Sequence, residues 1–342
     1  MKKLSLSDKF LFLTNSLLGV FTLFGYVIPF LNPNAFGLLS VMSLSMPLLL
    51  FTNAFFLTYW LLKLKKQLFV SLVVLGLGYN NLQTLFRFQE KKVFLTEDLK
   101  VMSYNVRLFN KSKWSKNDSL GEKTALLIRK KNPDILGIQE YYPTNKAPLD
   151  FPYSYVEKNP NGRSLAKQAL FSKYKMIDKG SLNFEKSGNN TIFADIVVKK
   201  DTLRIYNIHL ESMSIDKNKD NFGQKDPEAL LSRFKKSFSK QVVQVQKILE
   251  HQKASPYKTI FLGDFNNTAF SWAYRQLSNG KKDAFEEAGV GLGKSFDYVF
   301  PFRIDFILTE NCFEINNFKT FNVPYSDHYP IMTRIQIPKK IK

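Results

Sequence analysis

The sequence predicts an α/β domain built on β-sheets, preceded by a helical region that crosses a membrane. Two observations support this prediction. No Asp, Glu, Lys, Arg or His lies between Lys9 and Lys63, whereas the later part of the chain has short β-type apolar runs that alternate with turns and a few helical patterns. The uncharged stretch argues against a wholly soluble protein, and 342 residues are enough for both parts.

Residues 1–90 are predicted to form the membrane region. A membrane-spanning helix needs about 20 mainly apolar residues, and the uncharged stretch holds two such segments, at about residues 10–31 and 36–62, with an Asn-Pro-Asn turn between them. A third span is expected at about residues 67–86, although polar residues dilute its second half. A cleaved signal peptide has an apolar region of only about 7–15 residues followed by a small-residue cleavage site, and neither feature fits this chain.

The lysines that flank the spans predict their orientation, because Lys and Arg collect on the cytoplasmic side of short loops. Three lysines precede the first span, none lies between the first two spans, and three follow the second. With three spans, the domain at residues 99–342 lies outside the cytoplasm; with two, it stays inside. We therefore expect an integral protein of the cell (inner) membrane whose C-terminal domain is extracytoplasmic.

The C-terminal domain is basic and has one cysteine. Of the 49 Lys and Arg residues, six precede Arg87, as does one of the 29 Asp and Glu residues, so residues 87–342 carry a net charge of +15. This charge favours anionic partners such as nucleic acid, but a Lys-, Asn- and Phe-rich composition also arises from genome bias. The single cysteine, Cys312, excludes an intramolecular disulfide framework and a Cys-based zinc site.

Nine strands and three helices are predicted in this domain, and strands with helices between them favour an α/β fold over a helical bundle. The helices are expected at residues 119–131, 227–251 and near 270–277. The strands are expected at residues 100–106, 135–139, 169–172, 192–198, 203–210, 259–263, 304–308, 313–321 and 331–337.

Six segments of the domain place polar side chains at or beside the end of an apolar run, where a scaffold can bring side chains together. One such Asn, Asp or His is more often a turn or structural residue, but six segments together are a stronger signal. Carboxylates and amides without a thiolate suit Mg²⁺ or Mn²⁺, and imidazoles beside such a metal can transfer protons. The residues are Asn105, Glu140, Asn207, His209, Asp264, Asn266, Asp305, Asp327 and His328.

In this order, the six segments resemble those of the endonuclease/exonuclease/phosphatase superfamily, and of its type I deoxyribonuclease-like members in particular. The resemblance covers about residues 99–337 and implies a four-layer sandwich, in which helices flank two packed β-sheets and the site lies at one end of the sheets. The segments read Ser-Tyr-Asn-Val, Gly-Ile-Gln-Glu, Tyr-Asn-Ile-His-Leu, Leu-Gly-Asp-Phe-Asn, Arg-Ile-Asp-Phe-Ile and Ser-Asp-His-Tyr-Pro.

The resemblance implies roles for five residues around the metal and the attacking water. Glu140 corresponds to the principal metal ligand, assisted by Asn105 and Asp327. Asp264 corresponds to the carboxylate that orients or deprotonates the water, and Asn266 to the amide that holds the phosphate.

The resemblance also implies the roles of both histidines. His328 corresponds to the imidazole that contacts the scissile phosphate, with Asp305 as its carboxylate partner. His209 corresponds to the second catalytic histidine, and Asn207 beside it to a supporting substrate contact. A long polar loop at residues 211–226 is expected to shape the substrate groove.

The expected activity is that of a membrane-anchored, Mg²⁺-dependent phosphoesterase that hydrolyses phosphodiester bonds with metal-activated water; Mn²⁺ is an alternative cofactor. The sequence has no Gly-rich nucleotide loop and no Ser or Cys nucleophile elbow. The basic charge favours a nuclease, whereas anchoring beside a bilayer favours an enzyme of phospholipids, sphingomyelin or inositol phosphates. A non-enzymatic, membrane-held binding module is a poor third alternative because the polar set is intact. No protein partner can be inferred.

Overall fold

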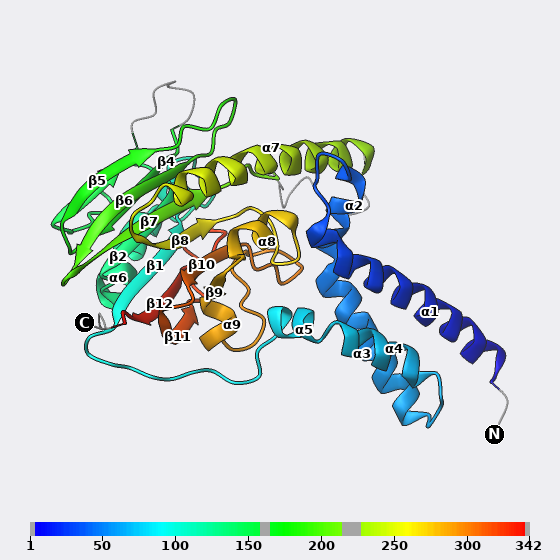
Figure 1. Cartoon of the computed structure of the whole chain (residues 1–342). Coiled ribbons are helices and arrows are strands. Elements are labelled where there is room, and N and C mark those ends of the chain that lie inside the picture. The colour runs from blue at the N-terminus through cyan, green and yellow to red at the C-terminus, as the bar shows by residue number, and fades with distance from the viewer. Residues whose placement is uncertain (1–3, 158–164, 214–226, 339–342) are drawn as a thin grey trace.

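The computed structural model of the chain describes residues 4–157, 165–213 and 227–338 (Figure 1). Two six-stranded sheets pack face to face and helices cover their outer faces, which confirms the expected sandwich. The first sheet has the order β11 (Glu314–Thr320), β12 (Ile331–Gln336), β1 (Leu99–Asn105), β2 (Ile135–Tyr141), β4 (Lys167–Ser172) and β3 (Tyr153–Val156). The second has the order β5 (Met176–Ser181), β6 (Thr191–Val198), β7 (Asp201–His209), β8 (Lys258–Asp264), β10 (Asp305–Glu310) and β9 (Lys281–Asp283).

The sheets pack through apolar side chains that alternate along each strand, as a half-buried strand requires. On β6, for example, Ile192, Ala194 and Ile196 all lie in the core between the sheets. The outer face of the first sheet is covered by α6 (Leu120–Lys131). The outer face of the second is covered by α7 (Pro227–Lys253) and α8 (Trp272–Ser278), and α9 (Ala284–Ala288) packs beside β11.

All nine predicted strands and all three predicted helices are present. The strands that the sequence did not indicate are β3, β5 and β9. Strand β3 lies at one edge of the first sheet, and β5 and β9 form the two edges of the second. An edge strand has a neighbour on one side only and does not need a continuous apolar run. The sequence of β9, Lys-Lys-Asp, therefore carries no strand signal.

The N-terminal region contains two helical segments that are long and apolar enough to cross a membrane, Leu6–Phe30 and Gly37–Leu62. The expected third span is broken into two helices that meet at an angle of 76°. The first of them has only 10 residues, fewer than a full span needs. The elements are α1 (Leu6–Val27), η1 (Ile28–Phe30), α2 (Gly37–Val41), η2 (Met42–Ser45), α3 (Met46–Leu62), α4 (Leu68–Leu77) and α5 (Tyr79–Leu85).

Packing in this region combines a buried apolar cluster, which includes Met46 and Leu50, with buried small and polar side chains. Small and polar side chains lie inside: the Asn53 amide donates to Thr22 Oγ1 at 2.8 Å, and Ser71 Oγ donates to Asn15 Oδ1 at 2.8 Å. Many other large apolar side chains face outward, on α1, α3 and α4 alike. Small residues at helix contacts and hydrogen bonds between helices are typical of helices that pack in lipid.

One end of the helical region contacts the C-terminal domain. At that end, α2 lies against α7, and the guanidinium of Arg275 on α8 lies 3.6 Å from the ring centroid of Phe30 (Figure 1). The α5 helix is also attached, because Arg303 Nη2 donates to the carbonyl oxygen of Thr84 at 3.2 Å. The start of α1 and the end of α3 are joined by the ion pair of Asp8 and Lys63, 2.5 Å apart, at the other end of the two spans.

Candidate active site

Strand register brings eight of the nine predicted site residues to one end of the two sheets. In the second sheet, β7 and β8 run parallel with His209 opposite Asp264, and β10 runs antiparallel to β8 with Asp305 also opposite Asp264. In the first sheet, β1 and β2 run parallel and end at Asn105 and just beyond Glu140. Asn266 and the pair Asp327 and His328 follow in the adjoining loops.

Five of these residues line a pocket of about 260 Å³. Its lining has a polar part, with the carboxylates and the imidazole, and an apolar part with Phe296 beside His328. The lining residues are Arg107, Glu140, Ser212, Met213, Asp264, Asn266, Phe296, Phe302, Ile304, Asp327 and His328. Of the expected groove-shaping loop, Ser212 and Met213 line the pocket, and residues 214–226 lie outside the described part of the chain.

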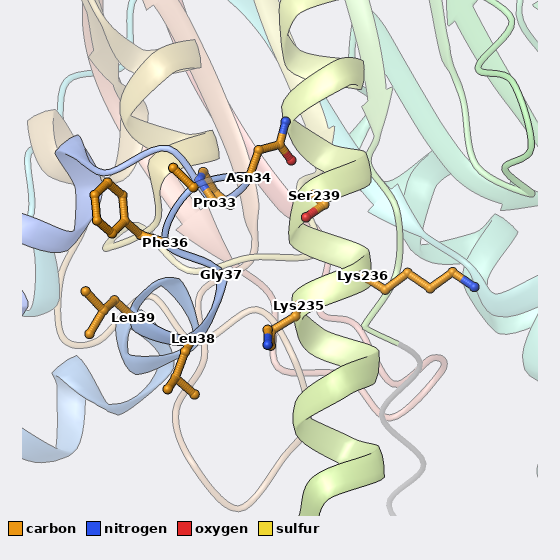
Figure 2. Close-up of a pocket in the computed structure, with 10 residues that line it drawn as sticks. Pro33, Asn34, Phe36, Gly37, Leu38, Leu39, Lys235, Lys236 and Ser239 are labelled. Carbon is orange, nitrogen blue, oxygen red and sulfur yellow. The ribbon is translucent and has the colours of Figure 1, made fainter.

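A larger hollow, of about 520 Å³, lies elsewhere, between residues 33–39 and α7 (Figure 2). Of the described residues that line it, only Lys235 and Lys236 are charged, and none is a carboxylate or an imidazole. We therefore assign the chemistry to the smaller pocket.

His328 is held as a cation by two carboxylates. Its Nδ1 lies 2.9 Å from Asp305 Oδ2, and its Nε2 lies 3.6 Å from Asp264 Oδ2. Burial opposes the charge, but Asp305 and Asp264 together raise the pKa of His328 to about 10. Ser295 fixes Asp305 in turn, because its Oγ accepts the Asp305 backbone N–H at 3.0 Å.

His209 approaches the same carboxylate from the neighbouring strand. Its Nε2 lies 3.5 Å from Asp264 Oδ2, so the two imidazoles converge on one oxygen although 119 positions separate them in sequence. Burial, with the charge of His328 as a second cause, lowers the pKa of His209 to about 3. The pair therefore consists of one neutral and one charged imidazole at neutral pH.

Asp264 is buried at the centre of this group. Its Oδ1 accepts the Asn266 backbone N–H at 2.8 Å, and its Oδ2 accepts from Asn105 Nδ2 at 3.0 Å. Burial raises the pKa of Asp264, and the positive charge of His328 opposes that rise. A carboxylate whose pKa is raised toward neutrality is suited to accept a proton from water.

The predicted metal ligands lie on the other side of Asn105. Asn105 Nδ2 donates to Glu140 Oε1 at 3.2 Å, and Asp327 Oδ2 lies 2.8 Å from Arg107 Nη1. Burial and the nearby charge of Asp327 raise the pKa of Glu140, although His328 and Arg107 oppose the rise. A hard divalent cation would add positive charge here, and an all-oxygen donor set fits one.

A second group of potential ligands is Asp264, Asp305 and His328, whose ligand atoms lie within 4.8 Å of one another. In this trio, His328 Nδ1 is already paired with Asp305. The other oxygen, Asp305 Oδ1, is buried without a hydrogen-bond partner among the described residues. Both this trio and the pair Glu140 and Asp327 could therefore hold a cation.

Asn207 differs from the expectation of a substrate contact. It is fully buried, its Nδ2 donates to the carbonyl oxygens of Ile138 at 2.9 Å and Ala169 at 3.0 Å, and its Oδ1 accepts from Gln139 at 2.5 Å. These bonds join β7 of the second sheet to β2 and β4 of the first. Asn207 thus supports the site from within the core, and no polar atom remains for a substrate.

Several residues of the site were not predicted from the sequence. Arg107 lines the pocket beside Asp327 and begins a run of four residues with positive φ, which also contains Phe109 and Asn110. Phe296 lies with its ring centroid 4.9 Å from that of His328. Arg107 lies two positions after Asn105, so its closeness to the first polar segment could have indicated it as a site residue. Nothing in the sequence around Phe296 indicated a site.

The family comparison agrees with this geometry. A family model described as the Endonuclease/Exonuclease/phosphatase family matches residues 102–328. The chain belongs to this family. Its fold is therefore that of a hydrolase of phosphoester bonds, and the enzymes of the endonuclease/exonuclease/phosphatase family depend on a divalent metal. A second model, described as a domain of unknown function (DUF8431), matches residues 8–85.

Solved structures show the same fold at low sequence identity. An endonuclease/exonuclease/phosphatase family protein from Bacteroides thetaiotaomicron is 18% identical with a TM-score of 0.53, over 71% of this chain and 98% of that one. A mannosyl-6-phosphatase from Bacteroides thetaiotaomicron is 18% identical with a TM-score of 0.52, over 70% and 100%. The human Nocturnin catalytic domain with bound sulfate is 15% identical with a TM-score of 0.52, over 75% and 99%. No protein with a curated description matches the chain.

Proposed function

We propose that the protein is a membrane-anchored phosphoesterase that depends on a divalent cation, Mg²⁺ or Mn²⁺, and uses water as its nucleophile. The observation that carries this proposal is the convergence of His209 and His328 on one oxygen of Asp264, in a pocket that the half-buried Glu140 also lines. Water attack at phosphorus needs a base, a source of positive charge for the phosphoryl oxygens and a way to protonate the leaving oxygen.

Each of these needs is met by a residue of the pocket. Asp264 orients the attacking water and accepts its proton. His328, charged and held by Asp305, donates its proton to the leaving oxygen as the P–O bond breaks, and the proton that Asp264 took from water then restores the imidazolium. Asn266 holds a phosphoryl oxygen. His209, neutral and buried, completes the contacts to the phosphoryl group. A divalent cation bound by Glu140 and Asp327, with Asn105 beside them, would neutralise phosphate charge.

Membrane anchoring and an extracytoplasmic catalytic domain are supported by the N-terminal helices. Many of their large apolar side chains, such as Phe24 and Phe55, face outward, and polar side chains such as Asn53 are buried between the helices. Lys9 and Lys63 flank the ends of α1 and α3 that meet at Asp8, whereas the catalytic domain contacts the opposite end, at η1 and α2. If the lysine-rich end is cytoplasmic, the catalytic domain lies outside.

Two substrate classes have support. The net charge of +15 on residues 87–342 favours nucleic acid, because phosphate contacts by Lys and Arg supply most non-specific affinity. The apolar wall of the pocket favours a phosphoester lipid instead. The evidence for a nucleic acid substrate is the net charge of the whole domain, whereas the evidence for a lipid substrate is the lining of the pocket.

The test is an assay of the purified full-length protein in detergent with Mg²⁺, against bis(p-nitrophenyl) phosphate and plasmid DNA. Hydrolysis is expected with Mg²⁺ or Mn²⁺, and it should be lost in excess chelator and in Asp264→Asn. Activity that persists in verified metal-free protein, or that is equal in Asp264→Asn, would contradict the proposal.

A further inference from the structure

Much of the apolar lining of the pocket comes from one aromatic loop, residues 296–302, and from Ile304 just after it. Phe296, Phe302 and Ile304 form a cluster, against which Tyr298 and Phe300 pack. The rings of Tyr298 and Phe302 are stacked, with centroids 5.8 Å apart and an interplanar angle of 8°. The alternating aromatics thus share one cluster, while Val299 between them is 88% exposed. The loop presents an apolar tip outside the pocket and an apolar wall inside it.

The aromatic loop also reaches the N-terminal helices. Phe302 lines the pocket and also lines a narrow crevice together with Pro301, Pro47 of α3 and Leu85 of α5. The wall of the pocket is therefore continuous with the ends of two helices of the membrane region.

A second apolar contact joins the pocket to the same region. Met213 lines the pocket and forms a buried cluster with Phe234 and Phe238 of α7. Val41 of α2 and Leu44 of η2 pack against this cluster. Two separate parts of the apolar lining thus lead to the end of the helices at which the chain would leave the bilayer.

Among the residues that the structure describes, the charges that line the pocket do not form a track for a nucleic acid backbone. Among the lining residues, Arg107 is the one Lys or Arg, and it is bound to Asp327 at 2.8 Å. A nucleic acid needs several cations along its backbone, whereas a phosphoester lipid needs one polar wall for the phosphate and one apolar wall for its chains.

We infer that the substrate is a phosphoester lipid, which enters the pocket from the membrane surface next to η1 and α2 along the loop at residues 296–302. This inference rests on the proposed phosphoesterase function and specifies its substrate class. Val299 then contacts the lipid surface, and the phosphate reaches Asp264 and His328 while the hydrocarbon remains against Phe296 and Phe302.

The test uses the full-length protein in phosphatidylcholine vesicles that contain phosphatidylglycerol, a phosphodiester, or phosphatidic acid, a phosphomonoester. Mg²⁺-dependent release of headgroup or phosphate is compared with hydrolysis of soluble bis(p-nitrophenyl) phosphate by the same sample. Val299→Asp is expected to lower the ratio of lipid to soluble hydrolysis by about tenfold or more, because a carboxylate is unfavourable in an apolar membrane contact. Leu126→Asp, at a residue of α6 that is 59% exposed, should leave the ratio unchanged.

The outcomes separate the inference from the function on which it rests. Hydrolysis of the soluble ester or of plasmid DNA without hydrolysis of either vesicle lipid would overturn the lipid inference, as would an unchanged ratio in Val299→Asp. If neither soluble nor vesicle-bound phosphoesters are hydrolysed with Mg²⁺ or Mn²⁺, the proposed function itself fails.

Discussion

At the scale of single residues, two histidines that touch the same carboxylate oxygen have opposite charge states. The difference follows from their partners: His328 has Asp305 on its Nδ1, whereas His209 is buried next to a cation. A charged imidazole can donate a proton throughout the neutral range, whereas His209 stays neutral there because its pKa is lowered to about 3. The arrangement thus places a charged donor and a neutral imidazole beside the base Asp264.

His328→Ala is expected to lower kcat on a soluble phosphodiester by about 10²–10⁴-fold, because it removes the charged donor at the phosphoryl group. Asp305→Asn should also lower kcat, since it weakens the support of the imidazolium. Steady-state kinetics measure both. The third histidine, His251, lies on α7 against Tyr206 and provides the matched control, His251→Ala, which should keep kcat. A kcat for His328→Ala within about twofold of the wild type would refute its role.

The sequence predicted most of the residues that meet at the pocket, because they lie at strand ends in a recognisable order. It could not predict which way each side chain faces. Asn207 and His209 differ by two positions on β7, yet one bonds across the sheets and the other contacts Asp264. The aromatic wall depends on tertiary packing of Phe296 and Phe302, and no spacing in the sequence indicated it.

At the scale of elements, the register of β7 and β8 sets the site, since it places His209 opposite Asp264. Gly263 permits this register. Its φ is +142°, and a Cβ at this position would lie 1.9 Å from the carbonyl oxygen of Ile208. The atoms that such a Cβ would meet belong to the backbone of Ile208, which cannot move aside as a flexible side chain could.

Gly263→Ala is therefore expected to destabilise the protein by about 1–3 kcal/mol, or more, because β7 and β8 must separate. Thermal unfolding of the full-length variant measures the effect as a lower melting temperature. Gly188→Ala is the control, because nothing lies within 4 Å of its added Cβ. Equal melting temperatures for the two variants would show that the close contact at Gly263 is not required.

Central strands and amphipathic helices were predictable because burial on one or both faces leaves a regular apolar pattern. The break between α4 and α5 was not predicted. It occurs at Gly78, where Tyr26 of α1 packs so closely that a Cβ would lie 2.0 Å from its Oη. This long-range contact is not visible in the sequence.

At the scale of the whole molecule, the side of the membrane on which the catalytic domain lies depends on whether α4 and α5 complete a third crossing. Cys312 offers a direct probe because it is exposed and is the single cysteine of the chain. A membrane-impermeant maleimide is expected to label it in spheroplasts before lysis. Cys312→Ser should remove the signal. Labelling that requires lysis would place the domain in the cytoplasm and exclude the third crossing.

The central claim is that Glu140 holds a divalent cation required for phosphoester hydrolysis, and one comparison tests it most directly. Turnover of bis(p-nitrophenyl) phosphate is measured over a Mg²⁺ titration for the wild type, for Glu140→Gln and for the exposed control Glu122→Gln on α6. The account predicts no wild-type turnover without metal, full turnover for Glu122→Gln and a loss of about 100-fold or more for Glu140→Gln at every Mg²⁺ concentration. Undiminished turnover by folded Glu140→Gln, or by wild-type protein verified to be free of metal, would contradict it.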